Sequence, residues 1–168
     1  GHQADAPGTG GDTSMNVYFS NSTSNRGTPI AVDDMQNSSN GDVALVHLSE
    51  PAPVNQYMPL ADSYERDSDV IDDYGLRATL VPTSGLYKAD VSILGESTDA
   101  YGGRAIHLEG VNGSSNHGDS GGPLIVIGQI VGVCSTGDST DPGSDIHAGP
   151  NYANLTDSRQ WITDVTGV

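Results

Sequence analysis

The chain has 168 residues, with 6 basic and 22 acidic side chains and a formal net charge of −16 at pH 7. A balance this acidic argues against nucleic acid or an anionic membrane surface as a partner. The length is enough to bury a real core, as one domain or two small ones. The single cysteine, Cys134, excludes an internal disulfide, so packing alone or bound ions must hold the fold together. No stretch approaches the ~18–20 apolar residues of a membrane-spanning helix.

The apolar residues occur in short runs separated by Gly, Asp, Asn, Ser and Pro, and 22 residues are glycine. This pattern predicts an all-β fold. Residues 1–16 are small and polar and predict a loop, which contains His2. Residues 17–19 and 29–32 then predict two short strands joined by a polar turn.

The next predicted strand, residues 43–48, begins directly after Asn40, Gly41 and Asp42. An aspartate after glycine is common as an Asx turn before a strand, and that is the purely structural interpretation of Asp42. His47 lies five residues further on, where strand alternation sends it to the opposite face from Asp42.

A polar connection over residues 54–70 is the predicted crossing to a second set of strands. There we expect a hairpin, with strands over 76–82 and 86–94 and a turn at 83–85, and a further strand over 104–108. Acidic pairs along the chain are oxygen ligands of the kind that calcium takes, but their spacing matches no calcium loop, so solvated charge is the favoured interpretation. These pairs are Asp33 with Asp34, Asp67 with Asp69, and Asp72 with Asp73.

One stretch, Gly118-Asp119-Ser120-Gly121-Gly122-Pro123-Leu124, is hard to explain except by chemistry. A serine between glycines on a tight turn lets the backbone approach a substrate carbonyl, with amide groups directed at the oxygen that becomes negative. The alternative is a glycine-rich hairpin loop before a buried strand at 124–127. Ser120 is therefore the candidate nucleophile.

The remaining sequence predicts strands over 130–137 and 151–155 and an amphipathic closing helix that contains Trp161 and Ile162. Thr156 or Asp157 is the expected cap of this helix. Cys134, within the first of these strands, is expected to be a small core residue rather than a reactive thiol.

The stretch around Ser120 resembles the nucleophile loop of the trypsin/chymotrypsin-like serine proteases, and the C-terminal third resembles secreted bacterial members. The run from Asp42 to Leu48, followed by Pro51, resembles that family's aspartate strand. The resemblance implies a double six-stranded antiparallel β-barrel with a C-terminal helix. Residues 1–60 would form a partial N-terminal barrel that lacks its first three strands, and residues 61–168 the C-terminal barrel.

The same resemblance implies a catalytic triad of His2, Asp42 and Ser120. His2 lies 40 residues before Asp42, a separation similar to the family's, and Gly1-His2 would be the end of its histidine motif. The alternative for His2 is a disordered chain end or a tag remnant, and His47 would then be the substitute base. The oxyanion would be bound by the N–H groups of Gly118 and Ser120.

Substrate binding is implied for four residues. Ser114, six residues before Ser120, stands where trypsins have an aspartate, so a neutral P1 side chain is preferred, although Asp138 or Asp145 could still supply a charge. Ser135, Thr136 and Gly137 would pair with the substrate backbone, and Ser135 would lie beside Asp42. Two further implied features concern other residues: Pro150 would narrow the pocket, and Arg77 is a guessed partner for Asp119.

The expected activity is that of a secreted serine endopeptidase acting on polypeptides through an acyl-enzyme, without a metal or cofactor. His107 and His117 have no partner at metal-ligand spacing, which argues against zinc. A separate N-terminal fragment could complete the first barrel. Two alternatives stay open: an inactive homologue that acts as a binding module, and an esterase-like hydrolase with the same triad.

Overall fold

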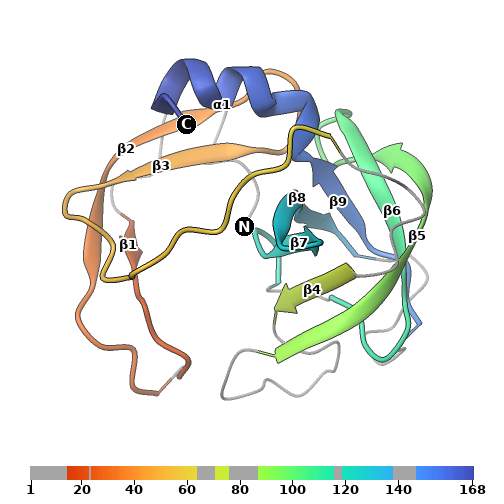
Figure 1. Cartoon of the computed structure of the whole chain (residues 1–168), viewed down its shortest axis with the longest axis horizontal. Coiled ribbons are helices and arrows are strands. Elements are labelled where there is room, and N and C mark those ends of the chain that lie inside the picture. The colour runs from red at the N-terminus through yellow and green to blue at the C-terminus, as the bar shows by residue number, and fades with distance from the viewer. Residues whose placement is uncertain (1–14, 23, 64–70, 76–86, 116–118, 138–146) are drawn as a thin grey trace.

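The computed structural model describes residues 15–22, 24–63, 71–75, 87–115, 119–137 and 147–168. These residues form two β-sheets and a short C-terminal helical segment, as the all-β prediction requires (Figure 1). The strands are β1 (Asn16–Val17), β2 (Ile30–Asn37), β3 (Ala44–Leu48), β4 (Ile71–Gly75), β5 (Tyr87–Thr98), β6 (Arg104–Gly110), β7 (Pro123–Val126), β8 (Gln129–Thr136) and β9 (Asn151–Asn154). The 3₁₀-helix η1 (Leu155–Ser158) and the α-helix α1 (Arg159–Thr166) follow.

Six strands close into an antiparallel barrel in the order β4-β5-β6-β9-β8-β7. The closing pair is β4 with β7, where Ile71 is opposite Val126. Closure gives each of the six strands a partner on both sides along at least part of its length, whereas the outer strands of an open sheet are unpaired on one side. The expected C-terminal barrel with its closing helix is therefore confirmed.

The core of the barrel is built from the inward-facing residues of its strands. Ile106 and Leu108 on β6, Leu124 on β7 and Tyr152 on β9 are fully buried. Alternate residues of a strand point to opposite faces, so Ile106 and Leu108, two apart, share one face. The β-branched and aliphatic runs that predicted these strands are the residues that fill the barrel.

The second sheet has three strands in the order β1-β2-β3. Figure 1 shows it as an open, curved layer on the other side of the molecule from the barrel. Among the described residues the N-terminal barrel is thus incomplete, as expected. β2 runs five residues beyond the predicted strand of residues 29–32, and its exposed acids Asp33 and Asp34 explain why an apolar pattern did not reveal the extension. Whether residues 1–60 and 61–168 are separate domains stays a prediction.

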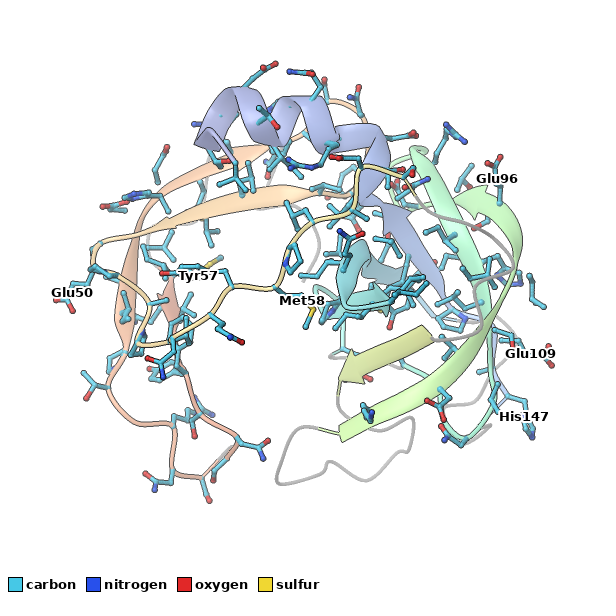
Figure 2. The ribbon with its side chains drawn as sticks, viewed as in Figure 1. Glu50, Tyr57, Met58, Glu96, Glu109 and His147 are labelled. Atoms are coloured by element: carbon cyan, nitrogen blue, oxygen red, sulfur yellow. The ribbon has the colours of Figure 1, made fainter. Side chains whose placement is uncertain are left out.

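The connection between the two sheets is attached to the barrel by backbone hydrogen bonds. The Ala61 N–H donates to the Ile130 carbonyl at 2.9 Å, and the Ile130 N–H donates to the Pro59 carbonyl at 2.9 Å. Leu60 therefore forms a parallel bridge with the start of β8. Tyr57 and Met58 project from this connection just before the bridge, and both are exposed (Figure 2).

β4 and β5 form an antiparallel pair in the region of the expected hairpin. β4 ends at Gly75, which is opposite Tyr87 at the start of β5. The predicted strand over 76–82 and the turn at 83–85 lie outside the described residues. β5 continues to Thr98, four residues past its predicted end, because a register shift between Ile93 and Gly95 keeps it paired with β6.

The predicted cap of the closing helix was wrong. Neither Thr156 nor Asp157 caps it: the chain leaves β9 through Asn154, whose side chain accepts a hydrogen bond from the Thr156 N–H at 3.0 Å and caps η1. The α-helix then runs from Arg159 to Thr166, and the residue that caps its C-terminus, Gly167, has a φ of 79°. That left-handed conformation suits glycine, and its N–H donates to the Thr163 carbonyl.

A matched pair of valines tests the barrel core. Val131 on β8 is 1% exposed and Val111 is 52% exposed. We expect Val131→Ala to lower the free energy of unfolding by about 2–3 kcal/mol, because two buried methyl groups are lost and a cavity remains. Val111→Ala should stay within about 0.5 kcal/mol of the parent. Chemical denaturation measures both, and equal effects would contradict this core.

Candidate active site

The candidate site is built around Asp42, which is 5% exposed and lies in the loop between β2 and β3. The Ser135 hydroxyl on β8 donates a hydrogen bond of 2.7 Å to Asp42 Oδ2. The Asp42 N–H donates one of 2.8 Å to Asp99 Oδ2. A buried carboxylate is tolerated where hydrogen bonds compensate its lost hydration. The expected placement of Ser135 beside Asp42 is present.

The loop that carries Asp42 is held by contacts on both sides of it. Before Asp42, the Ser38 hydroxyl lies 3.2 Å from the Ser158 hydroxyl of η1. After it, buried Val43 packs in a cluster with Leu155 and Ile162. The helical segment therefore fixes this loop against the barrel, and the aspartate is presented toward β8.

Ser120 lies on a tight turn that is anchored on the same strand. The Gly121 N–H donates to the Cys134 carbonyl, and the Cys134 N–H donates to the Gly122 carbonyl, each at 2.9 Å. Gly121 has a φ of 93°, a conformation that favours glycine. The serine is partly exposed and the preceding Asp119 is buried. Gly118, the other predicted oxyanion donor, lies outside the described residues.

β8 is therefore the common support of the two candidate groups. Cys134 holds the turn of Ser120, and the next residue, Ser135, holds Asp42. β7 pairs with β8 as far as Val133, so β8 continues beyond that partner. Thr136, predicted to bind a substrate backbone, ends this continuation, and the exposed Gly137, predicted to do the same, follows it. Thr136 Oγ1 accepts a hydrogen bond of 3.0 Å from Asn151 Nδ2.

The predicted pocket residues are buried close to the end of β6. The Ser114 hydroxyl donates to the Ala148 carbonyl at 3.0 Å, and that carbonyl also accepts from the Gly110 N–H. Pro150, the expected narrowing residue, is fully buried, and its carbonyl accepts from the Leu108 N–H. Asp138 and Asp145 lie outside the described residues, as does Arg77, the guessed partner of Asp119.

His2, the predicted base, lies outside the described residues, and so does His117. Of the described histidines, His47 is 74% exposed and its Nδ1 lies 2.6 Å from Asp33 Oδ1 on the neighbouring strand. That surface pairing turns His47 toward Asp33 and leaves it unsuited as the substitute base for a buried Asp42.

The other two described histidines are held by the barrel. His107 Nδ1 lies 3.0 Å from Asn151 Oδ1, and His147 Nδ1 lies 2.9 Å from the Gly110 carbonyl. His147 projects at the edge of the barrel away from the three-stranded sheet (Figure 2). In the part of the chain that the structure describes, no three His, Cys, Asp or Glu side chains are grouped as a metal site.

Asp99 was missed by the sequence analysis. It is 7% exposed and accepts hydrogen bonds from the backbone at the turn between β5 and β6 as well as from Asp42. The signal was the sequence Asp99-Ala100-Tyr101-Gly102-Gly103, because an aspartate at the start of a tight turn often accepts from the N–H two residues on. Nothing in the sequence connected this turn with Asp42.

Comparison with known proteins decides the family. The family model for trypsin matches residues 8–162. This chain belongs to the trypsin family. The matched residues include Asp42, Ser120 and Ser135, whereas His2 lies before them.

Solved structures of trypsin-like proteins share this fold. Neuropsin, a serine protease expressed in the limbic system of mouse brain, is 20% identical with a TM-score of 0.66 over 92% of this chain and 80% of its own. The inactivated protease paralogue S-D1 of the scabies mite is 16% identical with a TM-score of 0.74 over 99% and 82%. Kallikrein-related peptidase 10 is 18% identical with a TM-score of 0.66 over 83% and 74%. A search of curated protein sequences found no match.

Substitution of Ser135 tests the packing of this trypsin-family site. Ser135→Ala removes a donor to a buried carboxylate, so we expect the free energy of unfolding to fall by about 1.5–3 kcal/mol. Ser92→Ala, on the exposed side of β5, is the matched control and should change it by less than about 0.5 kcal/mol. Denaturant titration of the two variants measures the difference, and an unaffected Ser135→Ala protein would argue against the hydrogen bond to Asp42.

Proposed function

We propose that this trypsin-family chain is a serine endopeptidase with Ser120 as nucleophile, His2 as general base and Asp42 as the carboxylate that orients it. The supporting observation is the buried Asp42 carboxylate hydrogen-bonded to Ser135, one residue from the β8 position that anchors the Ser120 turn. A carboxylate held in this way is suited to fix the tautomer of a histidine and to stabilise the imidazolium.

In the proposed reaction, His2 takes the proton of the Ser120 hydroxyl as Oγ attacks the carbonyl carbon of a peptide bond. The oxyanion is stabilised by the Gly118 and Ser120 N–H groups. His2 then gives its proton to the leaving amine, the C–N bond breaks, and an acyl-enzyme remains. Water attacks that ester with His2 as base, which releases the acid and restores Ser120.

We propose a polypeptide substrate that pairs with Ser135, Thr136 and Gly137 as an added strand. The support is that β8 extends past its pairing with β7, and an unfilled sheet edge offers main-chain donors and acceptors. Ser114 is the proposed specificity residue. Its hydroxyl is engaged with the Ala148 carbonyl, so it brings no charge into the pocket and favours an uncharged P1 side chain.

We also propose an extracellular site of action, because trypsin-like proteases are typically secreted. A separate polypeptide segment completing the first barrel is part of the proposal, and the open three-stranded sheet supports it. Among the described residues, no helix is both long and apolar enough to span a membrane.

Covalent labelling tests the nucleophile. We expect a fluorophosphonate probe to add once to the folded protein, at Ser120, because the probe reacts with a hydroxyl that an adjacent base activates. Ser120→Ala should abolish the adduct, and Ser92→Ala should label like the parent. Intact mass and peptide mapping locate the adduct, and thermal unfolding verifies that each variant is folded.

One alternative is an inactive homologue that serves as a binding module. The similarity to the scabies mite inactivated paralogue, which extends over 99% of this chain, supports this alternative. Folded protein that takes up no probe would support this alternative and contradict the triad. An esterase-like hydrolase with the same triad would label at Ser120 but cleave esters and leave peptides intact.

A panel of peptide substrates that differ at P1 tests the pocket. With Ser114 neutral and hydrogen-bonded to the Ala148 carbonyl, we expect kcat/KM for a P1 Leu, Phe or Tyr to exceed that for Lys or Arg by about tenfold or more. Preferential cleavage after Lys or Arg would show that another acidic group reaches the pocket.

A further inference from the structure

We propose that Asp99 is a positioning residue that holds Asp42 in its working orientation. This role rests on the proposed function. The turn that joins β5 to β6 in the barrel would fix the position of the Asp42 carboxylate in the β2–β3 loop. Asp99 acts through Asp42 and is not itself placed in contact with a substrate.

The Asp99 carboxylate accepts hydrogen bonds from three backbone donors. Its Oδ1 accepts from the N–H groups of Tyr101 and Gly103, each at 2.9 Å. Its Oδ2 accepts from the N–H of Asp42 at 2.8 Å. The first two bonds close the turn in which Asp99 lies, whereas the third reaches a residue 57 positions earlier in the chain. One buried side chain thus shapes the turn and fixes the backbone of Asp42.

The same turn also orients the Asp42 side chain. The Ala100 N–H donates to the Ser135 hydroxyl oxygen at 3.0 Å. A hydroxyl has one hydrogen, and with its oxygen accepting from Ala100 that hydrogen is directed to Asp42 Oδ2, 2.7 Å away. Residues 99 and 100 therefore hold Asp42 at two points, its backbone N–H and one carboxylate oxygen.

Two glycines allow this close approach. A Cβ on Gly41 would clash with Asp99 Oδ2, and a Cβ on Gly103 would clash with the Asn40 carbonyl and the Gly41 Cα. The backbone before Asp42 thus lies directly against the turn, with no side chain between them. We call the hydrogen bonds from residues 99 and 100 to Asp42 and Ser135 the clamp. So short a connection allows the Asp42 carboxylate little movement, and catalytic groups must be held within about 0.5 Å of productive geometry.

Asp99→Asn and Asp99→Ser test the clamp. The amide of Asn keeps one acceptor oxygen for three N–H donors, so at least one of them loses its partner. Ser is shorter: its hydroxyl can still accept from the Tyr101 N–H within the turn, but it cannot reach Asp42. Asp62→Asn, an exposed carboxylate paired with Arg159, is the matched control.

The first measurement is amide hydrogen exchange of Asp42, made in the Ser120→Ala background so that it does not depend on activity. We expect its N–H to be protected in the parent, and its exchange to be about tenfold faster or more in Asp99→Ser and unchanged in Asp62→Asn. Unchanged protection in a folded Asp99→Ser protein overturns the proposal. This result is informative even if Ser120 is never labelled.

The second measurement is steady-state cleavage of a peptide by the Ser120-containing protein. We expect both Asp99 variants to lose about 10- to 100-fold in kcat with KM within about twofold, because the chemistry and not the binding surface is disturbed. A labelled, folded Asp99→Ser protein with parental kcat overturns the positioning role. Failure of the parent itself to label or cleave counts against the proposed function and leaves the exchange result to decide the clamp.

Discussion

The described structure depends on burying one carboxylate between its two sheets. Asp42 belongs to the chain that leads into β3, but its oxygen is hydrogen-bonded to β8 of the barrel and its N–H to the β5–β6 turn. An ionised group is expensive to bury unless every lost water contact is replaced. The open sheet can therefore pack against the barrel only in a position where the Asp42 oxygen and N–H both reach these hydrogen-bond partners.

Apolar packing supports this junction without a disulfide. Val43 joins the cluster of Ala153, Leu155 and Ile162, while Cys134 is buried with its thiol 3.5 Å from the Ser115 hydroxyl. The ion pairs of Arg104 with Glu96 and Asp157 lie at the described surface in contact with solvent, and each contributes little to stability.

Much of the barrel could be predicted because each of its strands is indicated by a contiguous run of residues in the sequence. Residues 104–108, 124–127 and 130–137 are short apolar runs bounded by turn residues, and each is within a few residues of the observed strand. β2 was under-predicted because half of it, including Asp33 and Asp34, is polar on an exposed sheet. The helix cap was misplaced because Asn154 ends a strand and begins a helical turn at the same position.

By itself, the sequence determined the family, the all-β class, the tight turn at Ser120 and the closeness of Asp42 to Ser135, since each follows from a contiguous motif or from a resemblance carried by one. Tertiary structure alone decided that Asp99 in the β5–β6 turn accepts a hydrogen bond from Asp42 and that His47 pairs with Asp33. It also decided that the first sheet is open, with three described strands. The reason is physical. A hydrogen bond across 57 residues depends on where two distant backbones pass each other, and no local pattern encodes that distance.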